Sequence, residues 1–528
     1  MYRTWARVPL LTGLLLTLSP TDSTGEEAAR AAGASRDNSP QSFWYGDRIP
    51  EPPAKSIHDF LTAPQGPLAQ LTRYMTSFDN SNGQTGLVLH DSRRSWSGYT
   101  LLSSLGGKWA GPQGPVSFSI LIDMEGNIVR EWPLFGFPAK LLPGGHVLGG
   151  AGGGLAGHQE QGALVQMDWC GNAVWSWAGT GAPGGARWHH DYQREGNPVG
   201  YFAPFQPPRT LGGKTLVLAH ANPDPALTRH ISDFPLEDDV LHEVDWAGNV
   251  LWTWNAWEHY EQMGFDATAR AAVRTIKVGA PEDIGGGFEE TDWQHINSAS
   301  YVGPNRWYEQ GDLRFHPDNV IWDGRSSNII AIIARHDHPR GAWKAGDIVW
   351  RVGPDYGPGT REHGLGQIIG QHHAHVIPWG LPGAGNVLVF DNGGLAGFGA
   401  LFPGLPPYWP VTYRDFSRVI EFNPRTLEVV WEYQLVRPEA GERKFFSWFI
   451  SSAQRLLNGN TLITEGATGR VFEVTRKGDV VWEYISPFER PTPSAFGNAV
   501  YRAYRVPSWW LPWNRECPPA TPGAGGPP

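Results

Sequence analysis

VTRKGDVVWEY, residues Val474–Tyr484, contains a strand, a turn with Gly or Asn, and a second strand that ends in Trp or Tyr. The same pattern recurs, in full or in a shorter form, in five other stretches: Ile122–Trp132, Met167–Trp177, Val244–Trp254, Phe422–Tyr433 and the shorter Asp347–Gly353. These units are linked to a further apolar run of the type turn, strand, Gly, such as NGNTLITEG from Asn458. Four strands per repeat is the make-up of a propeller blade. The sequence therefore predicts an all-β fold, a six-bladed β-propeller, with seven blades as the alternative count.

A propeller must close its ring, and the two ends of the repeat region suggest how. After Tyr484 the last repeat has only Ala499–Val506 (AVYRAYRV) left to complete it. Gly98–Gly107 (GYTLLSSLGG), near the start, has the pattern of the missing strand and no repeat of its own. We therefore expect this N-terminal strand to complete the last blade, because radial closure leaves fewer unpaired edges than a two-sheet sandwich.

The composition fits one large domain without affinity for polyanions. The 528 residues include 66 Gly and 45 Pro, which supply turns, and propellers grow by adding blades. The 26 Trp are far above ordinary usage, and we expect most of them to pack between blades. The net charge of −10 argues against a nucleic acid or an anionic membrane as partner.

The segments outside the repeats indicate export. Residues 1–25 are expected to be a secretory signal peptide, because Arg3 and Arg7 flank the start of the apolar core Val8–Leu18. An uncleaved anchor is the alternative. Residues 26–86 are expected to form a linker and an N-terminal cap, with a helix over Ser56–Met75, residues 87–507 the propeller, and residues 508–528 a Pro-rich tail. The protein would then be periplasmic or extracellular, with no membrane contact after cleavage.

Two cysteines, Cys170 and Cys517, provide no disulfide framework for an exported protein of this size. A single bridge between the C-terminal tail and the second blade is left open.

Histidines cluster where chemistry is expected. They occur in four short motifs: WHHD at Trp188–Asp191, WQHINS at Trp293–Ser298, RHDH at Arg335–His338 and QHHAH at Gln371–His375. Each motif lies just before, or at the end of, an expected apolar strand. Because the innermost strand of each blade borders the central channel, such residues from different blades can converge on one site.

Other histidines, namely His158, His220, His230, His242 and His259, are expected to be hydrogen-bonded surface or channel-rim residues. Arg335 is different in kind. It ends the apolar strand NIIAIIAR, where a cation is costly unless it meets an anion, and it therefore indicates an anion site.

Taken in order, the motifs HHD, WQHINS, IIARH, QHHAH with VFDNGG, and SSAQRLLNGNTLITEG with GRVFEVT and GDVVWEY resemble the bacterial aryl-sulfate sulfotransferases. The resemblance covers about Val116 to Glu483. It implies an exported six-bladed propeller that works without a nucleotide sulfate donor, on small-molecule aryl sulfates and phenols. Carried over motif by motif, it implies these site residues: His372 as the nucleophile, His295, Asn297 and Arg335 as sulfuryl-binding groups, and His190, with His189 less favoured, as the upstream histidine.

The chain departs from the family pattern at two places. The nucleophile motif is QHHA, with His373 where the family has Thr, so the register between His372 and His373 is open and His373 is a further substrate-binding candidate. Residues 43–86 do not reproduce the N-terminal domain of well-known members, which leaves homodimerisation open.

The chemistry of these residue types agrees with the family's ping-pong reaction. A neutral imidazole can attack the sulfur of an aryl sulfate without an activating base and form a sulfohistidine. His295, Asn297 and Arg335 would hold the charge on the transferred oxygens, and His190 would give and remove the phenol proton. Neither a cofactor nor a metal is required.

Two other classes of function are alternatives. A His-ligated metal enzyme could use His336, Asp337 and His338, or His373 and His375, because alternate residues on a strand share a face. A propeller that only binds a ligand is the other, since fold does not dictate function.

Overall fold

A computed structural model describes residues 84–110, 114–153, 159–179, 185–275, 290–394, 396–398, 414, 416–435, 445–489 and 497–517. These residues belong to one compact unit of the chain. The expected signal peptide and the expected helix over Ser56–Met75 lie outside the described residues, as does the tail from 518 on. None of the described helices is long and apolar enough to cross a membrane.

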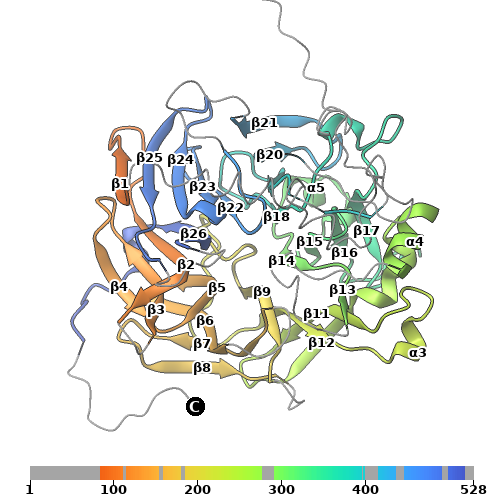
Figure 1. The fold of residues 1–528 in the computed structure, drawn as a ribbon, viewed down its shortest axis with the longest axis horizontal. Coiled ribbons are helices and arrows are strands. Elements are labelled where there is room, and N and C mark those ends of the chain that lie inside the picture. The colour runs from red at the N-terminus through yellow and green to blue at the C-terminus, as the bar shows by residue number, and fades with distance from the viewer. Residues whose placement is uncertain are drawn as a thin grey trace, which may run out of the picture. The chain divides into compact units, whose positions relative to one another are not determined.

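The described residues form a propeller-like ring of antiparallel sheets around a common centre, as predicted (Figure 1). One sheet has the order β26-β2-β3-β4 and consists of Val500–Val506, Tyr99–Trp109, Pro115–Ile122 and Ile128–Trp132. Two other four-stranded sheets follow chain order: β14 (Ile296–Tyr301), β15 (Val320–Gly324), β16 (Ile329–Ile333) and β17 (Ile348–Val352), then β18 (His372–Val376), β19 (Val387–Asp391), β20 (Arg418–Phe422) and β21 (Val429–Gln434).

A nine-stranded sheet combines two runs of four strands with one short strand. The first run is β5 (Phe135–Leu142), β6 (His146–Gly153), β7 (Gln161–Met167) and β8 (Ala173–Trp177); the second is β9 (Trp188–Arg194), β10 (Thr215–Ala221), β11 (Leu236–Val244) and β12 (Val250–Asn255). The runs join only where Gln161 of β7 pairs with Trp188 of β9. β13 (Thr291–Asp292) pairs in parallel with β11.

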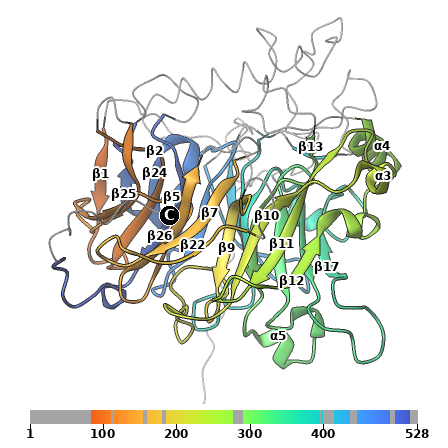
Figure 2. The same ribbon diagram turned by 90° about the horizontal axis from the view of Figure 1, so that it is seen from below.

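The last sheet has five strands, in the order β1-β25-β24-β23-β22: Gly86–His90, Val480–Ile485, Arg470–Val474, Thr461–Glu465 and Ser452–Arg455. The helices among the described residues are short. They are α3 (Pro225–Thr228), α4 (Ala267–Thr275) and α5 (Arg306–Glu309), with 3₁₀ turns at Ala256–Gln262, Leu313–Phe315, His363–Leu365, Gly466–Thr468 and Ser508–Trp510. Seen from the side, α3 and α4 lie toward one end of the strands and α5 lies at the other (Figure 2).

The two chain ends close the ring, but not as the sequence suggested. The expected strand Gly98–Gly107 does pair with the C-terminal strand, because β2 lies beside β26. It continues into β3 and β4 rather than into the last repeat, so the C-terminal β26 completes the first sheet. The strand that joins the last repeat is β1, which pairs with β25.

Tryptophans of the repeats bond each unit of the ring to the next. Within the described residues, six indole Nε1 groups donate to a backbone carbonyl in the following unit, at 2.8–3.0 Å. The pairs are Trp132 to Asp168, Trp175 to Trp246, Trp254 to Gly346, Trp350 to Pro424, Trp431 to Arg476, and Trp482 to Met124. The last of these runs from the final repeat back to the first, so the series returns to its start.

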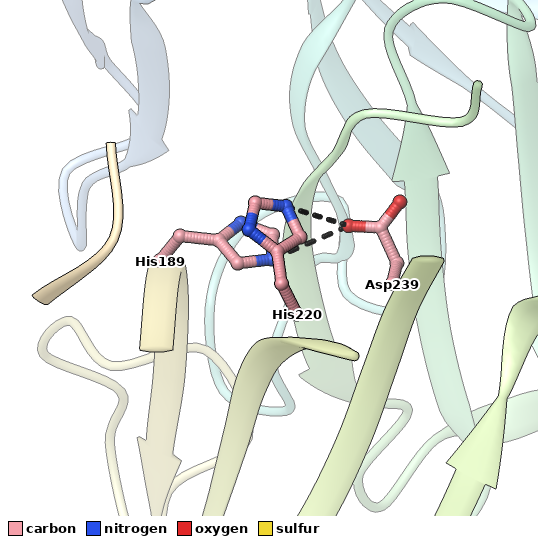
Figure 3. A group of neighbouring side chains, drawn as sticks. All are labelled: His189, His220 and Asp239. Carbon is pink, nitrogen blue, oxygen red and sulfur yellow. Dashed lines mark ion pairs between the residues drawn. The ribbon is translucent and has the colours of Figure 1, made fainter. Parts of the chain in front are cut away.

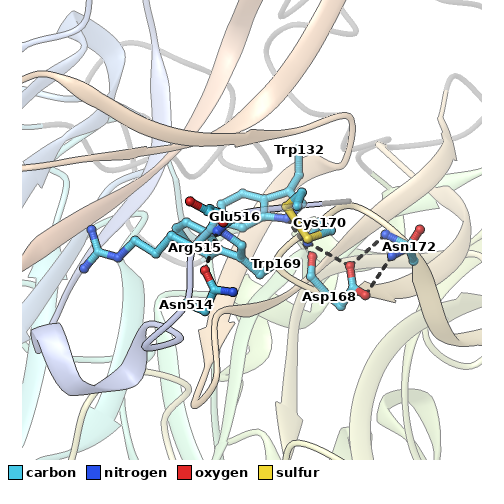
Figure 4. Close-up of a disulfide and its surroundings, with 9 residues drawn as sticks. Trp132, Asp168, Trp169, Cys170, Asn172, Asn514, Arg515 and Glu516 are labelled. Carbon is cyan, nitrogen blue, oxygen red and sulfur yellow. Dashed lines mark hydrogen bonds between the residues drawn. A yellow bond between two sulfur atoms is a disulfide. The ribbon is translucent and has the colours of Figure 1, made fainter. Parts of the chain in front are cut away.

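A disulfide fastens the C-terminal end of the chain to this ring (Figure 4). Cys170, in the turn between β7 and β8, is bonded to Cys517, with the two Cα atoms 5.5 Å apart. Beside it, the Trp169 indole donates to the carbonyl of Arg515 at 3.1 Å. Trp510 and Leu511, in the segment that leads to Cys517, are buried.

Candidate active site

Three of the four histidine motifs lie where the inner strands begin, whereas RHDH at Arg335–His338 follows β16. His190 lies in β9, His295 directly before β14, and His372 and His373 at the start of β18. His190, His295 and His373 share a left-handed backbone, with φ values of 55°, 50° and 57°. Residues other than Gly rarely adopt this conformation, and it concentrates at functional sites.

Three of the histidines gather at one place. The rings of His190 and His295 have their centroids 4.7 Å apart. Burial, and then the neighbouring histidines, His295 and His372 among them, hold the pKa of His190 well below its usual value. Phe137 packs 4.6 Å from the His190 ring and stacks on Tyr501 at 4.0 Å, which supplies an aromatic wall. All three histidines are buried.

The hydrogen bonds of His372 determine which ring nitrogen carries its proton. Its Nδ1 lies 2.8 Å from Oδ1 of Asn392 and 3.1 Å from the carbonyl oxygen of Gly370. Asn392 cannot be turned over, because its Nδ2 donates to the carbonyls of Ser447 and Ile450. Both neighbours of Nδ1 are acceptors, so Nδ1 donates and the lone pair lies on Nε2. Burial, and then the charge of Arg325, hold the pKa of His372 well below its usual value, so the ring is neutral.

Asn297 bonds the backbone of the residue that precedes His372. Its Nδ2 donates to the carbonyl of Gln371 at 2.8 Å, which links it to the residue before His372. Its buried Oδ1 has no hydrogen-bond partner among the described residues. Arg502 donates to its backbone carbonyl at 2.6 Å and also pairs with Asp191 at 3.0 Å.

Among the charged residues, Arg325 has the largest effect on the pKa of His372. The sequence analysis did not identify it. It directly follows β15, its backbone N–H donates to the carbonyl of His295 at 3.0 Å, and its side chain is only 5% exposed. Its charge is the second cause, after burial, of the lowered pKa of His372.

Arg335 lies elsewhere. It pairs with Glu243 at 3.2 Å and covers the ring of Trp252 at 4.0 Å. In its sheet Gly324 lies opposite both Ile296 and Ile329, whereas Val320 lies opposite Tyr301 and Ile333. Arg335 follows Ile333, so it lies at the far end of the sheet from His295, roughly 15 Å away at about 3.3 Å per residue.

His373 points into a different cluster from His372. Its Nδ1 donates to the carbonyl of Ala453 at 3.1 Å, and its Nε2 lies 3.5 Å from the hydroxyl of Tyr504. The next histidine on the same side, His375, lies 2.8 Å from the Tyr201 hydroxyl. His373 and His375 therefore form a separate polar layer beside β22 and β26.

Behind His190 and His295 lies a layer of carboxylates. The His295 Nδ1 bonds Oδ2 of Asp292. Nδ1 of His189 lies 2.7 Å from Nδ1 of His190, while its Nε2 faces Asp239 at 3.3 Å. Burial, and then the neighbouring Asp292, raise the pKa of Asp239 well above its usual value. The two ring nitrogens of His189 thus contact His190 and Asp239 rather than His372.

The ligands of the alternative metal set His336, Asp337 and His338 have other partners: His336 pairs with Asp318 at 3.1 Å, Asp337 with Lys344 at 3.2 Å, and His338 accepts from the backbone of Arg340. The alternative pair His373 and His375 contacts Ala453 and Tyr201. The first set is not among the groups in which the described residues bring three ligand atoms within 4.8 Å of one another. Those groups are His189, His220 and Asp239; Glu160, His220 and Glu237; and the partly exposed His316, Asp318 and His336.

Solved structures similar to this chain are remote. A protein of unknown function from Bacteroides caccae is 13% identical, with a TM-score of 0.36 over 78% of this chain and 99% of its own. A putative 6-phosphogluconolactonase from Bacteroides fragilis is 11% identical, with a TM-score of 0.33 over 79% and 99%. The Dos1 propeller is 10% identical, with a TM-score of 0.27 over 78% and 77%.

No curated protein sequence matches the chain significantly. The family comparison is decisive. Residues 213–487, just over half of the chain, match the arylsulfotransferase (ASST) family, and they contain His295, Asn297, Arg325 and His372. The chain is therefore a member of the arylsulfotransferase family.

Proposed function

We propose that this arylsulfotransferase moves a sulfuryl group from a phenolic sulfate ester to a phenol through a sulfohistidine on His372, without a nucleotide donor. We further propose a six-bladed ring, which the six tryptophan bonds between successive units support. The observation that carries the mechanism is the hydrogen bonding of His372, which leaves the lone pair of a neutral imidazole on Nε2.

In the first half-reaction, Nε2 of His372 attacks sulfur, an N–S bond forms, and the S–O bond to the phenol breaks. The ring then carries a positive charge, and its Nδ1–H remains bonded to Asn392 and Gly370. Burial and the nearby His295 hold the pKa of His190 well below its usual value, so neutral His190 donates a hydrogen bond to the departing phenolate, which takes its proton from solvent. In the second half-reaction, neutral His190 accepts the proton of an acceptor phenol as the phenol oxygen attacks the same sulfur and frees His372; that proton then passes to solvent.

The transferred group needs fixed donors for its oxygens, because charge is spread over them in the transition state. His295, whose charge would act on His372, and the amide of Asn297, which bonds the residue before His372, suit this role. The position of Arg325 leads us to assign the guanidinium role to Arg325 rather than Arg335, since Arg335 is already paired with Glu243 at the other end of the sheet.

The same geometry favours His372 over His373 as the nucleophile. His372 adjoins His295, Arg325 and Asn297, whereas both nitrogens of His373 face groups of another layer. Export to the periplasm or the cell exterior is part of the proposal, because a disulfide such as Cys170–Cys517 persists in an oxidising compartment.

Mixing the enzyme with a chromogenic phenyl sulfate and no acceptor tests the proposal. About one equivalent of phenol should be released in a burst, and the QHHAH peptide should gain the mass of one SO₃. His372→Asn should lose both burst and label, while the matched variant His373→Asn should keep them. A label that persists in His372→Asn would refute the assignment, and a wild type with neither label nor exchange between phenols would refute the reaction.

A further inference from the structure

We propose that His189, His220 and Asp239 bind a divalent transition-metal ion of the zinc type, behind the proposed sulfuryl site. The three residues come from the adjacent strands β9, β10 and β11. Figure 3 shows Nε2 of both imidazoles directed at the same carboxylate. All three side chains are buried, and their ligand atoms lie within 4.8 Å of one another.

The distances fit ligands around one small ion. Nε2 of His189 lies 3.3 Å from Oδ1 of Asp239, and Nε2 of His220 lies 3.9 Å from the same oxygen. Zinc binds imidazole nitrogen and carboxylate oxygen at about 2.0–2.2 Å in a tetrahedral arrangement, which places neighbouring ligand atoms roughly 3.3–3.6 Å apart. Of the two separations from Asp239, one already matches and the other needs a shift of a few tenths of an ångström; the two Nε2 atoms lie within 4.8 Å of each other.

Two of the ligand atoms lack another use. Nε2 of His189 and Oδ1 of Asp239 are buried and make no hydrogen bond with the described residues, although they face each other. An unbonded buried nitrogen and an unbonded buried carboxylate oxygen are each costly, and a shared cation would satisfy both.

The other ring nitrogens are held as metal-bound histidines usually are. Such histidines hydrogen-bond a carboxylate, a carbonyl or another acceptor through the nitrogen that does not bind the metal. Nδ1 of His220 lies 3.1 Å from Oε1 of Glu160, and Nδ1 of His189 lies 2.7 Å from Nδ1 of His190. In both rings Nε2 is then the nitrogen that faces Asp239.

Charge favours this group over its neighbour Glu160, His220 and Glu237. Arg187 already pairs with Glu160 at 2.6 Å and with Glu237 at 3.4 Å, so a cation is present there. Asp239 instead lies near a second buried carboxylate, Asp292, and a divalent ion would offset both charges. The rings of His189 and His220 stack at 3.6 Å with 20° between their planes, so ion binding would require them to splay.

Direct metal binding tests the proposal independently of sulfuryl transfer. The full chain would be freed of metal with a chelator, dialysed, and titrated with Co²⁺ while its visible absorption is recorded; bound zinc would be measured by mass spectrometry after incubation with Zn²⁺. Wild type should bind about one ion with the absorption of low-symmetry four-coordinate Co²⁺. His220→Asn and Asp239→Asn should each weaken binding more than tenfold, and His316→Asn, in the exposed group, should not.

Several results would overturn the proposal. They are a wild type that binds no stoichiometric ion, binding that survives Asp239→Asn but is lost in Glu237→Gln, and binding lost only in His316→Asn. Near-UV circular dichroism would show whether each variant folds. If His220→Asn and Asp239→Asn do not fold, X-ray absorption of the Co²⁺-loaded wild type decides: two imidazoles with oxygen ligands support the site, and any other imidazole number rejects it.

Discussion

The two arginines Arg325 and Arg335 make opposite predictions for the same substitution. Arg335 is the cation that the sequence singles out, and Arg325 is the one beside His372 in the structure. Replacing each in turn by Lys keeps the charge but removes the planar fork that can hold two oxygens at once. Comparing Arg325→Lys with Arg335→Lys therefore shows which arginine acts in sulfuryl transfer and which one only stabilises the fold.

The expected magnitudes follow from the surroundings of each residue. Removing one donor to a developing oxyanion costs about 10²–10³ in kcat, and Lys retains the charge, so Arg325→Lys should lose roughly 10²-fold in the rate of the burst. At Arg335, Glu243 keeps its bonds to Lys214 and Tyr301, each 2.9 Å long. Arg335→Lys should then lose only the stacking on Trp252, about 0.5–1 kcal/mol of stability, with transfer unchanged.

Rapid mixing with a nitrophenyl sulfate would measure the burst of phenol release, and thermal melting would check that both variants fold. A loss of burst in Arg335→Lys together with an unimpaired Arg325→Lys would refute the reasoning, because the cation at the far end of the sheet would then be the one that contacts the substrate.

Three further perturbations test other parts of the account. Burial and the charge of Arg325 hold the pKa of His372 well below its usual value, so the nucleophile stays neutral as the pH falls. With a nitrophenyl leaving group, the burst rate should therefore stay level below about pH 6.5. A tenfold decline in the burst rate per pH unit, starting at that pH, would contradict this. Cys517→Ser should lower the free energy of unfolding by about 2–4 kcal/mol without changing turnover. An unchanged melting temperature would show that the disulfide does not stabilise the C-terminal segment on the ring. Trp482→Phe should lower the free energy of unfolding, measured in urea, by about 1–3 kcal/mol, because the carbonyl of Met124 loses its hydrogen-bond partner. The control Trp509→Phe, at an exposed position, should leave the free energy of unfolding almost unchanged. Equal losses in the two variants would show that the bond from Trp482 to Met124 does not stabilise the ring.

The ring itself was predictable because its pattern is local. Each repeat carries its own strand, turn and aromatic end, and the tryptophans at those ends form the bonds between units. The sheet in which the two ends of the described chain meet could not be predicted in the same way. β2 and β26 have similar apolar patterns and do pair, but the sheet to which they belong depends on the continuation of β2 into β3. The repeat at Ile122–Trp132 lacked an inner strand, and β26 supplies it.

The convergence of His190, His295 and His372 could be inferred because each occupies the same position in its repeat, at the start of an inner strand. The residues that support them could not be found in the same way. Asn392 sets the proton of His372 through a contact that spans 20 residues, and Asp292 bonds His295 from the short strand β13. Such partners depend on side-chain directions that periodicity does not determine.

Three of the supporting residues, His220, Arg325 and Asn392, nevertheless share one position, which strand direction explains. In an antiparallel repeat, the first strand starts at the histidine end, the second strand ends there, and the third strand starts there and leads away. His220 lies at the end of the second strand β10, Arg325 directly after the second strand β15, and Asn392 directly after the second strand β19. Each contacts or acts on a histidine of its own sheet: His220 stacks on His189, the backbone of Arg325 bonds His295, and Asn392 bonds His372. Arg335 follows the third strand β16, so strand direction alone places it at the opposite end. An arginine after an apolar strand was a sound signal for an anion site. Whether it lies at the histidine end of the sheet depends on how many strands separate it from the preceding histidine motif: two strands return the chain to that end, and three take it to the opposite end.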